Sequence, residues 1–238
     1  MTAADGSAGA RPDLVAKEDA DTAGPSFAFA TLATHPRGAT LTSPVEDTPV
    51  DRVTEAVRRL GDALLRTDRA DPSLPGFADV LEAIAERIED GASPVQQRLV
   101  DMWAGEGVTR HDPVTGAENV IAPPLVLRGE PDGTVRGEVT LTIPYQGPPG
   151  CVHGGVSAML LDHTLGVANA WAGKDGMTAQ LNTRYHRPTP LFEELEVWGR
   201  QERTEGRKIW TVGEIRARGE VCVSVEGLFI AKKLARPR

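Results

Sequence analysis

Residues 147–173 read GPPGCVHGGVSAMLLDHTLGVANAWAG. The stretch opens with a turn, because the Gly-Pro-Pro-Gly run at 147–150 can continue neither a strand nor a helix. After His153-Gly154-Gly155, apolar side chains recur at helical spacing until Gly173. A Gly-Gly pair therefore opens one long, mostly apolar helix. Such a helix must be buried, and one face of an antiparallel sheet can cover it.

The start of this predicted helix is suited to stabilising negative charge. Backbone N–H groups in a first helical turn lack partners within the helix, and glycines let a ligand approach them closely. Asp162 interrupts the apolar run eight residues after Gly154, which is about 12 Å along a helix. One small reacting group cannot touch both residues of one chain. The spacing therefore predicts a dimer whose site combines residues of two chains.

Around this helix the sequence has the period of β-strands. A hairpin is expected at 125–130 and 134–143, around a Pro-Asp-Gly turn. Four more strands are expected at 177–187, 193–203, 207–217 and 220–231. Short connections favour an antiparallel meander, and the fold class is α+β. Alternation would place Thr178, Gln180 and Asn182 on one strand face, where they could line a site.

The N-terminal half has a different composition. Residues 1–50 are expected to be largely disordered or loosely packed, followed by a helical extension at 51–118 and the sheet domain at 119–235. Within the extension, 51–67 and 77–90 have the apolar spacing of two amphipathic helices. A cap packed on the sheet domain is the simplest interpretation, and a lid or an oligomer contact are the alternatives.

Charge and composition exclude several classes of protein. Residues 1–120 hold 11 basic and 21 acidic side chains, and 121–238 hold 15 and 13, so neither half has the basic surface of a nucleic-acid binder. The two cysteines form no disulfide framework or metal pattern. We find no signal peptide, and no apolar run long enough to cross a bilayer. A cytoplasmic protein without nucleic-acid or membrane partners is expected.

Two motifs in this order resemble a known family. The turn GPPG-x-x-HGG at 147–155 and the strand T-A-x-L-N-x-x-Y-x-R-P at 178–188 resemble PaaI-type hotdog-fold acyl-CoA thioesterases, of the 4-hydroxybenzoyl-CoA thioesterase-like superfamily. The resemblance covers about 120–233. It implies a hotdog fold, an antiparallel sheet wrapped around a long central helix. It also implies an acyl-CoA substrate and a homodimer or homotetramer.

The resemblance also implies roles for single residues. Gly154, beside Gly155, would donate its N–H to the thioester oxyanion. Asp162 would act as general base on water or as nucleophile. Thr178 would hold the attacking water or the carboxylate. His153 would be either catalytic or a structural residue that fixes the turn.

Substrate contacts are expected elsewhere on the chain. Many relatives carry an Asn or Gln where this chain has Gly147, and Gln146 stands beside it. Basic side chains are usual partners of phosphates, and Arg187 and Lys208 are the best candidates for coenzyme A. No metal or cofactor motif occurs, so coenzyme A would enter only as part of the substrate.

Two other functions remain open. One is a non-catalytic acyl-CoA binding or sensing protein. The other is an acyl-thioester hydratase or dehydratase, which would need a histidine paired with an acidic residue. His153 and His163 are available for that chemistry.

Overall fold

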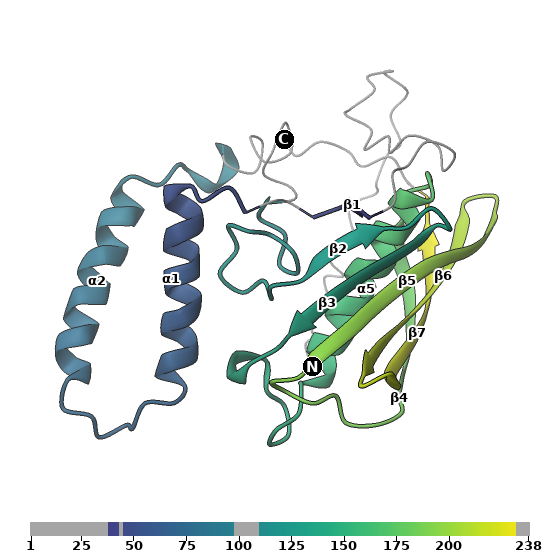
Figure 1. Cartoon of the computed structure of the whole chain (residues 1–238). Coiled ribbons are helices and arrows are strands. Elements are labelled where there is room, and N and C mark those ends of the chain that lie inside the picture. The colour runs from purple at the N-terminus through teal and green to yellow at the C-terminus, as the bar shows by residue number, and fades with distance from the viewer. Residues whose placement is uncertain (1–37, 43–44, 98–109, 232–238) are drawn as a thin grey trace, which may run out of the picture.

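A seven-stranded antiparallel sheet wraps around one long helix (Figure 1). The computed structural model describes residues 38–42, 45–97 and 110–231. The helices are α1 (Pro49–Leu64), α2 (Leu74–Asp90), the short 3-10 helix η2 (Ile143–Tyr145) and α5 (Gly154–Trp171). The strands are β1 (Ala39–Thr40), β2 (Val126–Gly129), β3 (Thr134–Thr140), β4 (Met177–Tyr185), β5 (Glu194–Glu205), β6 (Lys208–Ala217) and β7 (Glu220–Ile230). This is the expected hotdog fold.

Glycines line the part of the sheet on which the central helix packs. Leu165, at the middle of α5, is fully buried. A Cβ atom added at Gly199, Gly213 or Gly227 would lie within 3.0 Å of its methyl carbons. These glycines belong to the adjacent strands β5, β6 and β7. Because no side chain intervenes there, the helix packs directly on the sheet backbone, and the apolar helix predicted from the sequence is the core of the domain.

The strand order corrects one prediction. The order is β1-β2-β3-β5-β6-β7-β4, so β5, β6 and β7 form the expected meander, whereas β4 pairs with β7 at the far edge. The connection from β4 to β5 is not a hairpin, because the two strands are not neighbours. Backbone hydrogen bonds hold this connection against the turn before α5. Val152 N–H donates to the carbonyl of Thr189 at 2.9 Å, and Leu191 N–H donates to that of Gly150 at 3.1 Å. The chain therefore crosses the end of the sheet before it re-enters.

The two N-terminal helices differ in how they meet the rest of the molecule. A capping box formed by Thr48 and Asp51 starts α1, and Arg58 of α1 donates to the carbonyls of Gly116 and Asn119 at 2.9 and 2.6 Å. By contrast, α2 has no buried residue. In Figure 1, α2 stands on the side of α1 away from the sheet.

The expected domain boundaries stay predictions. Most of segment 1–50 lies outside the described residues. Within it, Ala39 and Thr40 pair with β2 and extend the sheet by one short strand. No pattern in the sequence predicted this strand.

Candidate active site

The first turn of α5 leaves one backbone donor open. His153 is the N-cap residue, and its Nδ1 accepts a hydrogen bond from Gly155 N–H at 3.0 Å. The N–H groups of Val156 and Ser157 donate to the carbonyl of His153 at 2.9 and 3.2 Å. Within the described part of the chain, Gly154 N–H has no acceptor. This amide is therefore available to a ligand oxygen at the positive end of the helix dipole.

The turn before the helix explains why Gly147 replaces a polar residue. A Cβ atom at Gly147 would lie 2.7 Å from the Cα of His153, so no side chain fits without moving the helix start. The neighbouring Gln146 uses its side-chain oxygen to accept from Gly150 N–H at 3.3 Å. In this structure Gln146 closes the turn.

A carboxylate and a hydroxyl meet further along α5. Thr178, near the start of β4, donates through Oγ1 to Oδ1 of Asp162 at 2.8 Å. Asp162 is half-buried and Thr178 is exposed. Two other polar side chains of the helix are engaged elsewhere: Thr164 donates to the carbonyl of Leu160, and the side-chain oxygen of Asn169 accepts from Thr211. Asp162 thus keeps one carboxylate oxygen for other partners.

A β-bulge corrects the predicted face of β4. Thr178 pairs with Phe229 of β7, but the next pair is Gln180 with Leu228. The extra residue reverses the alternation. Thr178 therefore shares the helix-facing side with the buried Phe229, whereas Asn182 points to the outer face. The expectation that Thr178, Gln180 and Asn182 share one face is wrong.

Tyr185 joins the site although no role was predicted for it. Tyr185 is the last residue of β4, and its hydroxyl donates to the carbonyl of Gly154 at 2.9 Å. A Cβ atom on Gly154 would come within 3.3 Å of the Tyr185 ring. The tyrosine therefore fixes the residue whose amide is open. Its only signal in the sequence was its place in the T-A-x-L-N-x-x-Y-x-R-P strand.

Comparison with known proteins identifies the family. The family model of the thioesterase superfamily matches residues 149–224, a range that includes the start of α5, Asp162 and Thr178. A solved structure, the thioesterase superfamily protein RHA08564, is 64% identical, covers 84% of this chain and 100% of its own, and has a TM-score of 0.78. The chain belongs to the thioesterase superfamily. Residues 41–97 match a second model, described as the N-terminal helical domain of the hypothetical protein RHA1_ro05818.

Curated relatives match less than half of this thioesterase-superfamily chain. The acyl-coenzyme A thioesterase THEM4 of Xenopus laevis is 35% identical over 38% of this chain and 41% of its own length. THEM4 of Bos taurus is 38% identical over 37% of each chain. The chain thus spans about two fifths of these relatives' length.

The two predicted phosphate ligands of the thioesterase-superfamily domain lie far apart. Arg187, just beyond β4, forms an ion pair with Glu220 at the start of β7. Lys208, at the start of β6, pairs with Ile230 at the end of β7. Ten residues of strand separate these ends by about 33 Å. Both cations of one chain cannot bind the same diphosphate.

His163 is held by the segment before the sheet. Its Nε2 lies 3.1 Å from Thr115 Oγ1, and its Nδ1 lies 3.4 Å from a carboxylate oxygen of Asp112. Burial lowers the pKa of His163, although the charges of Asp112 and Asp162 oppose the shift. The ring is therefore neutral near pH 7, and both nitrogens face partners in the chain.

Across the described residues, no helix is both long and apolar enough to cross a membrane.

Proposed function

We propose that this protein hydrolyses acyl-CoA thioesters to free coenzyme A and a carboxylic acid. The observation that carries the proposal is the arrangement on α5: an open Gly154 amide at its N-terminus and the Asp162–Thr178 pair two turns further on. Oxyanion stabilisation and a carboxylate are the two elements that thioester hydrolysis requires. The family and the acyl-coenzyme A thioesterase relatives support the same chemistry.

In the proposed reaction the thioester oxygen accepts a hydrogen bond from Gly154 N–H. Asp162 removes a proton from water, whose oxygen bonds to the carbonyl carbon. The C–S bond then breaks, and the proton passes to the departing thiolate. Alternatively, Asp162 attacks the carbonyl first, the C–S bond breaks and the thiolate leaves; water then hydrolyses the resulting anhydride, which releases the carboxylic acid and restores Asp162, and the proton lost from water passes to the thiolate. In both routes the Thr178 hydroxyl holds one carboxylate oxygen and orients the other toward the substrate.

Two chains supply one site in this proposal. Within one helix, eight residues separate Gly154 from Asp162, a distance of about 12 Å. Strand β4 lies at the sheet edge and carries the exposed side chains of Met177 and Tyr185. Its Thr178 end serves Asp162, and its Tyr185 end serves Gly154. Antiparallel pairing of two β4 edges about a two-fold axis would set each Asp162 beside the partner's helix start.

The alternatives lack support from the geometry. A hydratase would need a histidine whose nitrogen reaches the substrate. His153 caps the helix through Nδ1 and has no acidic partner among the described residues. Both His163 nitrogens face side chains of the same chain, Thr115 and Asp112. A purely sensing protein would have no need for the Asp162–Thr178 pair. Intact catalytic groups therefore favour hydrolysis.

The test is thiol release from a panel of short, long and aromatic acyl-CoAs. We expect release by the wild type and a loss of about 10²–10⁴-fold in kcat for Asp162→Asn. Glu196→Gln, on an exposed position of β5, is the matched control and should keep full activity. Binding of every acyl-CoA without release would contradict hydrolysis and favour a sensing protein.

A further inference from the structure

The helical extension presents an apolar surface that this chain does not cover. Four large side chains recur on one side of α2 and are each 49–58% exposed: Phe77, Val80, Ile84 and Ile88. They lie within about 80° of one another around the helix axis. The helix has no buried residue, yet helices of this type gain most of their stability from packing their apolar face. This α2 ridge therefore indicates a missing contact.

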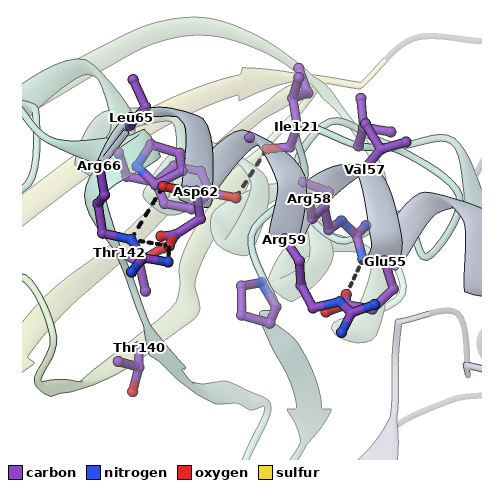
Figure 2. Close-up of a pocket in the computed structure, with 16 residues that line it drawn as sticks. Glu55, Val57, Arg58, Arg59, Asp62, Leu65, Arg66, Ile121, Thr140 and Thr142 are labelled. Atoms are coloured by element: carbon purple, nitrogen blue, oxygen red, sulfur yellow. Dashed lines mark hydrogen bonds and ion pairs between the residues drawn. The ribbon is translucent and has the colours of Figure 1, made fainter. Parts of the chain in front are cut away.

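The same chain also has a groove with apolar side chains in its wall, against which such a ridge could pack. A groove of about 760 Å³ lies between α1 and the segments 120–124 and 140–145. Its wall includes four exposed apolar side chains, Val57, Leu65, Val120 and Ile121. Figure 2 shows the α1 side of this groove, with Leu65 and Val57 at its edge and Arg58 and Arg59 between them. None of the proposed catalytic residues lines it.

A chain cannot fill its own groove with its own ridge. Figure 1 places α2 on the far side of α1 from the sheet, whereas the groove lies between α1 and the sheet domain. Helix α1 thus stands between the α2 helix and the groove of the same chain. Two chains can satisfy both surfaces if each inserts α2 into the other's groove, and such a reciprocal exchange closes about a two-fold axis.

Charge favours this occupant over a membrane or a nucleic acid. Helix α2 has five acidic residues and one basic residue, a net charge of −4. The groove is lined by three arginines and two acidic residues, a net charge of +1. Opposite net charges steer such surfaces together. Helices that bind anionic membranes instead carry lysine and arginine on the polar face.

We infer that the α2 ridge docks into the α1 groove of a second copy of this chain. This contact is separate from the β4 edge and does not depend on the proposed catalysis. Together, the two contacts would join two β4-paired dimers into a tetramer.

Sedimentation velocity on the full chain tests the contact. Ile84→Asp on the ridge and Val57→Asp in the groove should each halve the mass of the wild-type assembly. Both positions are exposed, so circular dichroism and activity per chain should not change. Glu82→Ala, on the opposite side of α2, is the matched control and should keep the wild-type mass. An unchanged mass in both aspartate variants would overturn the inference.

Cysteine cross-linking tests the docking partner directly. Under oxidation, a mixture of Ile84→Cys and Leu65→Cys chains should give a two-chain disulfide product that neither variant, nor the wild type with Cys151 and Cys222, gives alone. Cross-linking of Ile84→Cys by itself would place α2 against α2 and overturn the groove as the site. Wild-type binding to phosphatidylglycerol–phosphatidylcholine vesicles, lost in Ile84→Asp at unchanged mass, would assign the ridge to a membrane instead.

Discussion

At Gly154 the proposed chemistry depends on one backbone N–H, and the position allows that group to be removed alone. Gly154 is the first residue of α5, and His153 before it is extended, with φ −62° and ψ 133°. Proline is tolerated at the first helical position, and the residue before it must be extended. Gly154→Pro should therefore keep the helix and delete the oxyanion donor.

We expect Gly154→Pro to lower kcat by about 10²–10³-fold, the usual effect of one lost oxyanion donor. Gly154→Ala is the matched control, because it adds the same Cβ atom near Tyr185 and keeps the N–H. It should lose far less activity. Steady-state kinetics with one acyl-CoA checks both variants. Equal losses would show that crowding at Tyr185, and not the missing donor, is responsible.

His153 tests structural support against catalysis. Its Nδ1 caps the helix by accepting Gly155 N–H, a bond that an asparagine side chain can replace. His153→Asn should keep kcat within a few-fold. His153→Ala should lower stability by about 1 kcal/mol, measured by urea denaturation. A flattened pH–rate profile in the asparagine variant would instead assign the imidazole to proton transfer.

At the scale of elements, a buried ion cluster attaches α1 to the segment that precedes the sheet domain. Arg110 bonds Asp51 of α1 at 2.6 Å and Glu118 at 2.5 Å, and His111 bonds the other oxygen of Glu118 at 2.6 Å. Burial alone would raise the pKa of Glu118, but the hydrogen bonds from Arg110 and His111 outweigh it and hold that pKa low. The cluster therefore works only when its carboxylates are charged.

This cluster predicts a pH-dependent contribution to stability. A carboxyl group with a lowered folded-state pKa stabilises the fold above its unfolded pKa, and the stability is lost as pH falls through the folded value. Glu118→Gln should cost about 1–3 kcal/mol at pH 7. The difference from wild type should shrink below about pH 4.5. Urea denaturation at pH 7 and pH 4 measures both values, and a difference independent of pH would contradict the role of this charge.

Local patterns in the sequence predicted the elements but not their neighbours. The period of 3.6 located α5, and alternation located β2 to β7 nearly to the residue. The edge position of β4 depends on pairing with β7, where Phe229, the partner of Thr178, lies 51 residues further along the chain. Between Thr178 and Gln180 the register of this pairing shifts. The bulge between those two residues leaves no periodic signal, so the face of Asn182 could not be predicted.

The candidate site, too, could be predicted only where its residues belong to one local pattern. Gly154 and Asp162 were recognisable because their roles depend on one helix and its spacing. The Tyr185 contact joins residues 31 positions apart, and nothing local to Tyr185 predicts it. For α2, the amphipathic pattern was clear, but a pattern does not say what the apolar face will meet.

At the scale of the whole molecule, the decisive question is whether one site uses two chains. Exposed, unpaired edges such as β4 normally associate or are protected, and the α5 spacing prevents one chain from supplying both Gly154 and Asp162. A mixed dimer of two inactive variants separates the models. In a Gly154→Pro/Asp162→Asn dimer, a shared site would carry both defects at one position and neither at the other.

We therefore expect activity to return when the two inactive variants are unfolded together, refolded and assayed. Random association makes half of the dimers mixed, and each mixed dimer has one intact site, so about a quarter of wild-type activity should appear. Each variant refolded alone controls for residual activity. Mixing the folded variants without unfolding should restore less, because the subunits must first exchange. If every site belonged to a single chain, each mixed dimer would hold two damaged sites and the mixture would stay as inactive as its components.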